Sequence, residues 1–239
     1  MSDGLAFQQR TGDSIRELAL FAGAGGGILG GELLGWRTVC AVEFDAHAAS
    51  VLVARQNDGC LEPFPVWSDV RTFDGRPWRG IVDVVSGGFP CQAFSTATAG
   101  KSTADDLWPE MRRVVADVAP RCVFAENVSR EAIDTAADEL EAMGYKARCL
   151  ALSAADLGAD HLRPRYWLCA YADLHGEFRS GIDAEMAGVP LIRPGVWDSD
   201  PGSFRVADGM AGRMERIRAV GNGQVPAVAA TAFRILSKP

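Results

Sequence analysis

The sequence predicts an α/β protein with an open, mostly parallel sheet that has helices on both of its faces. Short apolar runs with strand-like composition alternate with amphipathic helical patterns, and a glycine-rich turn follows the first of these runs. The chain has 239 residues, of which 48% are hydrophobic, so it can bury one sizeable core. We therefore expect one compact domain with at most a small appendage.

Six runs are predicted to be strands: residues 15–21, 38–42, 81–86, 122–125, 148–152 and 167–171. Residues 45–55, 107–118 and 130–143 show helical patterns, and the last two have their apolar residues on one face. The alternation stops after Tyr171 and returns in residues 226–236, a short helix that begins with proline. In such sheets a ligand binds beyond the carboxyl ends of the strands, where the strand order reverses.

Composition excludes several classes of protein. No apolar run approaches the roughly 20 residues that a bilayer requires, so we expect a soluble protein without a membrane partner. The six cysteines form no CxxC pair and only three histidines accompany them, so neither a disulfide framework nor a metal site is expected. Cys40, Cys122 and Cys169 are predicted to be small core hydrophobes. The net charge of -7 is unusual for a nucleic-acid partner, but eight arginines lie between residues 161 and 218 and could form a local binding face.

A glycine-rich turn and two acids mark a candidate ligand site. The segment ELALFAGAGGG places glycines where the first strand turns into a helix, and such a turn lets a ligand approach the backbone closely. Glu43 follows about 20 residues later at the end of the next strand, where a carboxylate can bind ribose hydroxyls. Asp69 in WSDV is expected to end the third strand and to accept a hydrogen bond from an adenine amino group. Because FAGAGGG differs from GxGxxG, a nucleoside without a pyrophosphate fits better than a dinucleotide.

Cys91 is the candidate nucleophile. It lies in the loop FPCQAFS after the strand VDVVSGG, where a thiolate is accessible. The next strand, in RCVFAENVSR, brings Glu126 to the same edge of the sheet, where partial desolvation would raise its pKa and allow it to protonate a ring nitrogen. The segment LRPRYWL places Arg163 and Arg165 before an apolar strand, and their alternate spacing predicts that both point to one side.

Together, these segments resemble the cytosine-5 DNA methyltransferase family. FAGAGG is similar to the family's first motif, SGGFPCQAFS to its nucleophile motif, ENV to its acid motif, LRPR to its RxR motif and GNGQVP to its late asparagine motif. The motifs occur in the family's order, from Leu18 to about Phe233, and two longer segments resemble short bacteriophage or prophage members. The resemblance implies a Rossmann-like methyltransferase fold with a seven-stranded sheet and a small loop-rich insert.

The resemblance also implies an activity, that of a DNA (cytosine-5-)-methyltransferase. The Cys91 thiolate would add to carbon 6 of a cytosine that is flipped out of double-stranded DNA. S-adenosyl-L-methionine would donate a methyl group to carbon 5 and be released as S-adenosyl-L-homocysteine. The implied catalytic residues are Cys91, Glu126, Arg163 and Arg165. The implied cofactor-binding residues are Phe21, Ala22, Gly23, Gly25, Gly26, Glu43, Phe44, Asp69, Val70, Pro90, Leu107, Asn222 and Gln224. The residues expected to contact DNA are Gln92, Ser95, Arg179, Arg193 and Arg205. We expect a monomer in the cytoplasm of a bacterium or a phage-infected host cell, with no metal ion.

Three segments follow from this assignment: a catalytic core at residues 1–171, a target-recognition insert at 172–218, and a C-terminal segment at 219–239 that returns to the core. The sequence departs from the family pattern at Ala93, where proline is usual, and at His161, where glutamine is frequent. The part of the insert between Tyr171 and about Gly202 is short, so the recognised DNA site is expected to be short or loosely specified.

Three other functions remain open from the sequence. An RNA cytosine methyltransferase would use the same residues, and a catalytically silent DNA-binding relative would keep the same fold. The glycine turn taken alone would also suit an NAD-dependent oxidoreductase, although the PCQ and ENV motifs speak against it.

Overall fold

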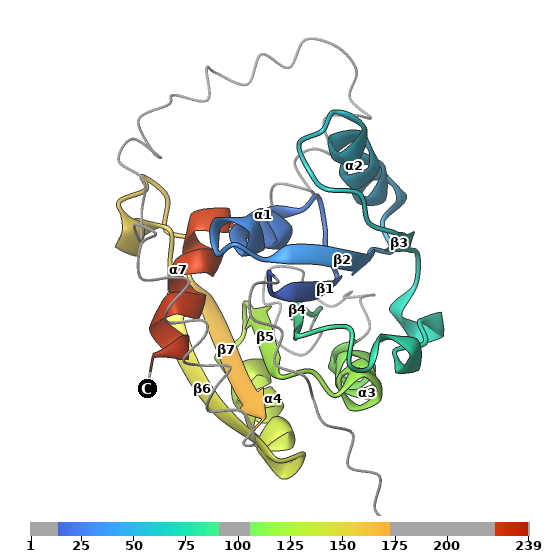
Figure 1. Cartoon of the computed structure of the whole chain (residues 1–239). Coiled ribbons are helices and arrows are strands. Elements are labelled where there is room, and N and C mark those ends of the chain that lie inside the picture. Colours follow the sequence, from blue (N-terminus) through green and yellow to red (C-terminus); the bar gives the residue numbers. More distant parts are fainter. Residues whose placement is uncertain (1–13, 91–105, 173–222, 239) are drawn as a thin grey trace, which may run out of the picture.

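The computed structural model describes residues 14–90, 106–172 and 223–238, and its centre is a sheet of seven strands (Figure 1). The strand order is β3-β2-β1-β4-β5-β7-β6. Neighbouring strands from β3 to β5 are parallel, whereas β7 is antiparallel to both β5 and β6. The strands are β1 (Arg16–Leu20), β2 (Arg37–Val42), β3 (Val66–Trp67), β4 (Val84–Gly88), β5 (Cys122–Asn127), β6 (Tyr145–Leu152) and β7 (Arg165–Ala172). The predicted seven-stranded, mostly parallel sheet is therefore confirmed.

Helices connect the strands, and local signals set where several of them begin. The α-helices are α1 (Gly26–Leu33), α2 (Ala46–Asn57), α3 (Trp108–Val118), α4 (Arg130–Ala142) and α7 (Pro226–Ser237), and the short 3-10 turns are η1 (Val70–Thr72), η2 (Arg76–Trp78) and η3 (Ala155–Leu157). The Asp45 carboxylate caps α2 by accepting the Ala48 N–H, and the Ser129 hydroxyl caps α4 by accepting the Ala132 N–H. Proline opens α7, because its missing N–H costs nothing in the first turn of a helix.

The helices cover both faces of the sheet, as the sequence predicts. On one face α3 and α4 pack their apolar sides against the strands, with Met111, Val114 and Leu140 fully buried. On the other face α7 lies beside α1 (Figure 1) and contributes Phe233 to an aromatic cluster with Trp36 and Phe124. Helices on both faces leave ligands access mainly at the ends of the strands. None of the helices in the described parts of the chain is long and apolar enough to cross a bilayer.

Some strand boundaries differ from those predicted. The fourth strand begins at Val84 rather than at Ile81, because the N–H groups of Ile81 and Val82 bond back to the Trp78 carbonyl in a turn. The third strand is only two residues long and ends at Trp67, so Asp69 lies beyond it. The strand order reverses between β1 and β4, and the carboxyl ends of these two strands therefore flank the position at which α/β proteins bind ligands.

Candidate active site

The candidate site lies where the carboxyl ends of four parallel strands meet. The register pairs Leu20 with Val42 on one side and with Gly87 on the other, and it pairs Gly88 with Glu126. The residues that follow β1, β2 and β4 are thus neighbours at one edge of the sheet. A cavity opens there, and Phe21, Gly23, Gly88, Glu126, Gly223 and Gln224 are among the residues that line it.

The turn after β1 is held by the carboxylate of Glu43. The backbone of this turn is left-handed at Phe21 (φ 52°), Gly23 (φ 55°) and Gly25 (φ 93°), a conformation that glycine adopts without a steric penalty. The Gly23 N–H donates to Glu43 Oε2 at 2.6 Å, and the Asp45 N–H donates to Glu43 Oε1 at 2.7 Å. Burial raises the pKa of Glu43, and these backbone hydrogen bonds oppose that rise. Each carboxylate oxygen still has a lone pair available for a hydroxyl group.

Beside Glu43, an apolar ring and a second acid face the same edge. The Phe44 side chain is 71% exposed, and the Arg71 guanidinium carbon lies 5.2 Å from the centre of its ring. The expectation that Asp69 ends a strand is wrong: Asp69 caps η1 and accepts hydrogen bonds from the backbone N–H and the Nε of Arg71. These bonds lower the pKa of Asp69 and keep it ionised near neutral pH. Arg71, which the sequence reasoning missed, joins the two side chains expected to bind adenosine.

Glu126 is the buried carboxyl of the site, at 7% exposure. Arg165 Nε lies 2.7 Å from its Oε1, and Gln224 Nε2 lies 3.4 Å from its Oε2. Burial raises the pKa of Glu126, and the charge of Arg165 and the hydrogen bond from Gln224 lower it. A Cβ at Gly88 would lie 2.6 Å from Glu126 Oε2, so glycine at this position leaves the space that the carboxyl occupies. Gln224, expected beside the cofactor, therefore also contacts the acid.

The two arginines of LRPR reach this carboxyl by different routes. Arg165 is the first residue of β7 and pairs with Glu126 directly. Arg163 precedes the strand with φ 40°, so the alternate spacing of a strand does not apply to it, and its guanidinium donates to the Gly223 carbonyl. Desolvation is the main cause that lowers the pKa of Arg163, while the charge of Glu126 raises it. Both arginines thus lie near Glu126, although the strand argument for Arg163 is wrong.

Two hydrogen bonds hold the backbone immediately before the candidate nucleophile. Asn127 Nδ2 donates to the Phe89 carbonyl at 2.8 Å, and the Leu107 N–H donates to the Pro90 carbonyl. These two bonds fix the backbone from which Cys91 follows, and the sequence reasoning did not assign this role to Asn127. The predicted site residues that lie outside the described ranges are Cys91, Gln92, Ser95, Arg179, Arg193, Arg205 and Asn222.

The three cysteines that were predicted to be core residues lie outside the site. Cys40, Cys122 and Cys169 are buried, as expected, and burial raises the pKa of Cys40 to about 12. Cys122 Sγ and Cys169 Sγ lie 3.5 Å apart within the core. In the ranges that the structure describes, no cluster of His, Cys, Asp and Glu side chains is suited to hold a metal ion.

Comparison with known proteins connects this site to one family. The family model for C-5 cytosine-specific DNA methylases matches residues 15–183. The Type II methyltransferase M.NgoMIV of Neisseria gonorrhoeae is 33% identical over 171 residues, which are 67% of this chain and 53% of that protein. M.Eco47II of Escherichia coli is 42% identical over 118 residues, 46% of this chain and 26% of that protein. The chain thus spans about half or less of the length of these curated relatives.

Solved structures give the same architecture. An Escherichia coli protein whose structure is described as a DNA modification methyltransferase encoded within a prophage superposes with a TM-score of 0.54 at 26% identity, over 67% of this chain and 47% of that one. The DNMT2 protein of Spodoptera frugiperda superposes with a TM-score of 0.55 at 20% identity, over 68% of this chain and 51% of that one. The second likeness concerns the fold alone.

Proposed function

Because the chain belongs to the C-5 cytosine-specific DNA methylase family, we propose that it transfers a methyl group from S-adenosylmethionine to carbon 5 of cytosine in double-stranded DNA. The observation that supports this most is the placement of Glu126. Arg165 holds its buried carboxyl next to Gly88, and Gly88 lies three residues before Cys91 in the chain. An acid with a raised pKa next to a cysteine loop is the pair that addition to a pyrimidine ring requires.

The residues at the ends of β1 and β2 fit S-adenosylmethionine. The Glu43 carboxylate is oriented by two backbone N–H groups and can accept ribose hydroxyls, and the exposed Phe44 ring offers an apolar surface for adenine. The turn from Phe21 to Gly25 presents backbone to the cavity without a basic side chain for a pyrophosphate. When bound, S-adenosylmethionine supplies an electrophilic methyl group on sulfonium sulfur.

The proposed reaction divides the work between Cys91 and Glu126. A target cytosine leaves the duplex at a cost of a few kcal/mol, and the Cys91 thiolate forms a bond to its carbon 6. Glu126 donates its proton to ring nitrogen 3, so the electron pair displaced by the thiolate gathers at carbon 5, which attacks the methyl group. A base then removes the carbon 5 proton, and the C–H electron pair restores the ring double bond and expels the Cys91 thiolate. The proton on ring nitrogen 3 returns to Glu126, so that overall one methyl group replaces the carbon 5 proton.

Arg165 directs this step by occupying one oxygen of the acid. It binds Oε1 at 2.7 Å, whereas Oε2 receives only the longer bond from Gln224, so Oε2 is the oxygen we assign to ring nitrogen 3. A planar guanidinium fixes a carboxylate more rigidly than an ammonium group does. Arg163, near the same carboxyl, adds positive charge that favours an electron-rich ring adduct.

We extend the proposal to the organisation of the C-terminal part of the chain, of which residues 173–222 and 239 lie outside the described ranges. Residues 172–218 would form the target-recognition insert, in which Arg179, Arg193 and Arg205 contact DNA, and residues 219–239 would complete the core. Arginine suits this role because its fork pairs with guanine or with phosphate oxygens. The composition of the insert, rich in glycine, proline and arginine, supports this assignment.

A trapping experiment tests the proposal directly. The wild-type protein is incubated with S-adenosylmethionine and duplex DNA containing 5-fluorocytosine, which blocks loss of the carbon 5 substituent and should leave a covalent protein–DNA adduct. Cys91→Ser should form no adduct, whereas Cys60→Ser, which changes an exposed cysteine outside the site, should form it normally. An adduct that persists in Cys91→Ser would contradict the proposed mechanism.

Two further arms separate the alternatives. Bisulfite sequencing of DNA from cells that express the protein reports 5-methylcytosine, and parallel incubation with transfer RNA tests the RNA substrate. Methylation of transfer RNA alone would overturn the DNA assignment and leave the chemistry in place. A thermal-shift comparison of S-adenosylhomocysteine with NAD tests the cofactor, and stabilisation by NAD alone would overturn it.

A further inference from the structure

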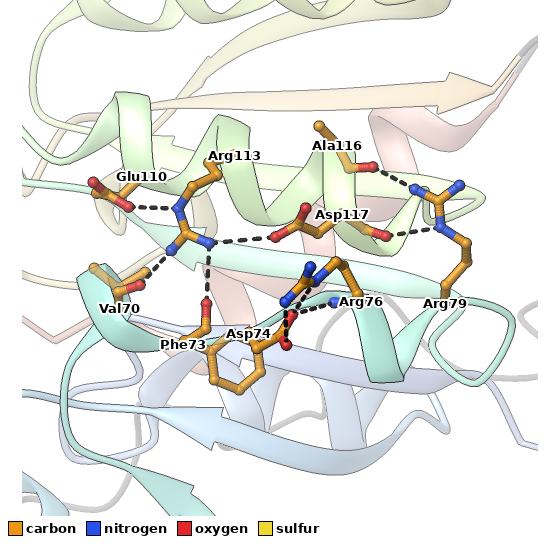
Figure 2. Close-up of polar contacts among 9 residues, drawn as sticks. All are labelled: Val70, Phe73, Asp74, Arg76, Arg79, Glu110, Arg113, Ala116 and Asp117. Atoms are coloured by element: carbon orange, nitrogen blue, oxygen red, sulfur yellow. Dashed lines mark hydrogen bonds and ion pairs between the residues drawn. The ribbon is translucent and has the colours of Figure 1, made fainter.

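Arg113 on α3 binds the backbone of the segment that follows β3 (Figure 2). Its Nη2 donates to the Val70 carbonyl at 2.6 Å, and its Nη1 donates to the Phe73 carbonyl at 3.0 Å. Val70 is the first residue of η1, and Phe73 directly follows its last residue. One guanidinium group therefore holds both ends of this turn.

Two carboxylates of the same helix orient that guanidinium. Glu110 Oε2 lies 2.8 Å from Arg113 Nε, and Asp117 Oδ2 lies 3.3 Å from Nη1. Such half-exposed pairs stabilise a helix only slightly. Here they have a second effect, because a planar fork fixed by two carboxylates presents its remaining N–H groups in set directions. The two carbonyls of the η1 segment accept those N–H groups.

The η1 segment depends on this support. A 3-10 turn of three residues has little stability of its own. Its start is fixed by the Asp69 cap and by the Val70 side chain, which is 4% exposed and packs in the same core as the apolar face of α3. Arg113 binds the carbonyl of the peptide that joins Val70 to Arg71. Arg71 in turn pairs with Asp69 and lies over the Phe44 ring, so Arg113 supports the backbone from which Arg71 reaches these two side chains.

We infer that Arg113 is a positioning residue for the adenosyl half of the S-adenosylmethionine site, an inference that rests on the proposed function. It touches no part of the expected ligand. It acts through the η1 backbone, which carries Asp69 and Val70, and it lies six residues after Leu107, whose N–H binds the Pro90 carbonyl before the nucleophile loop. The η1 segment and the start of the nucleophile loop are therefore both attached to α3.

A second arginine that joins α3 to the segment after β3 provides a matched control. Arg79, which follows η2, donates to the carbonyls of Ala116 at 2.7 Å and Asp117 at 2.9 Å near the C-terminal end of α3 (Figure 2). Like Arg113, it joins α3 to the segment after β3 through two backbone carbonyls. It lies ten residues beyond Asp69, so it shares the bridging role without holding η1.

The test compares Arg113→Lys with Arg79→Lys. Lysine keeps the charge but cannot bind two carbonyls with a planar fork, and both variants should fold because neither side chain is buried. Calorimetry should show that Arg113→Lys weakens S-adenosylhomocysteine binding by about tenfold, whereas Arg79→Lys stays within about twofold of the wild type. In steady-state assays the KM for S-adenosylmethionine should rise in Arg113→Lys while kcat changes little, a split that general loss of stability would not produce.

Each result has one meaning. If the wild type binds S-adenosylhomocysteine and both variants bind it with wild-type affinity, Arg113 has no positioning role and the inference is overturned. If the wild type does not bind S-adenosylhomocysteine, the proposed function itself fails. Equal losses of affinity in both variants would reduce Arg113 to a general structural bridge and would also overturn the inference.

Discussion

Replacing Glu43 by glutamine should disrupt cofactor binding although the two side chains have nearly the same shape. The carboxylate accepts the N–H groups of Gly23 at 2.6 Å and Asp45 at 2.7 Å, one on each oxygen. A glutamine amide has only one oxygen, so its NH₂ group must face one of these N–H donors. The substitution therefore turns one of the two hydrogen bonds into a donor–donor clash, removes the charge that strengthens the other, and weakens the acceptor available to ribose.

The expected magnitude follows from these contacts. A hydrogen bond to a charged group contributes about 1.5–3 kcal/mol, so the Kd for S-adenosylhomocysteine should rise by about 10- to 150-fold in Glu43→Gln. Isothermal calorimetry measures this change. The free energy of unfolding should fall by less, because the Glu43 side chain is partly exposed and water can replace the lost contacts.

Asp83→Asn is the matched control for this prediction. The Asp83 carboxylate also accepts a backbone N–H, that of Arg16 at 3.0 Å, and pairs with the Arg16 side chain, but it precedes β4 at the opposite edge of the sheet. It should lower stability and leave cofactor affinity unchanged. An unchanged Kd in a folded Glu43→Gln protein would refute the assignment of Glu43 to the ribose.

Four further predictions test other parts of the molecule. Asp69→Ala should weaken S-adenosylhomocysteine binding less than Glu43→Ala does, because the Asp69 charge is already paired with Arg71; calorimetry that ranks them in reverse would contradict this. Glu126→Gln should lower the methyl-transfer rate by about 10²–10⁴-fold. Because burial raises the pKa of Glu126 and the reaction uses its protonated form, loss of that proton should lower the wild-type rate at high pH, on top of the rise that ionisation of the Cys91 thiol gives. The same high-pH fall in Glu126→Gln would exclude Glu126 as the acid. Burial raises the pKa of Glu17 from 4.5 to about 7, so the native state keeps a proton that the unfolded state loses, and between these pH values the free energy of unfolding should fall with rising pH by about 1.4 kcal/mol per unit. Urea titrations of Glu17→Gln should lack that slope. Alanine at Arg179, Arg193 or Arg205 should reduce the slope of log DNA affinity against log salt by about one unit for a phosphate contact, or relax the methylated sequence at one position for a base contact; three variants identical to wild type would remove the insert as the recognition element.

Sequence alone could predict which edge of the sheet holds the site, because that conclusion needs only local patterns. Apolar runs define the strands, and parallel strands bring their carboxyl ends together, so Glu43 and Glu126 had to lie on the same side. The single antiparallel strand, β7, did not disturb this, since Arg165 at its start meets the end of β5. Topology therefore places residues that are far apart in the chain without any knowledge of side-chain contacts.

The partners of these side chains could not be predicted in the same way. Gln224 and Glu126 are 98 positions apart, and no periodicity relates them. Asp69 was expected to accept a hydrogen bond from adenine, but Nε of Arg71, two positions later, donates to both of its oxygens, at 2.9 Å and 3.2 Å. Both outcomes depend on rotamers and loop geometry, which are decided by packing and not by residue type.

The glycines of the first turn show most clearly how one pattern conceals two physical causes. Gly23 and Gly25 are left-handed, so their lack of a side chain permits the turn that faces the cavity. Gly26 and Gly27 have ordinary helical geometry, but a Cβ there would lie 2.1 Å from the Gln224 carbonyl oxygen and 2.4 Å from its Oε1. Gly26 thus admits the backbone of the segment before α7, and Gly27 leaves room for the Gln224 side chain that reaches Glu126. Gly26 therefore serves the acid at least as directly as the cofactor with which the sequence grouped it. The run of glycines thus serves both halves of the site. Gly23 and Gly25 shape the turn at the cofactor half through their backbone angles, and Gly26 and Gly27 leave space for Gln224 at the half that holds the acid.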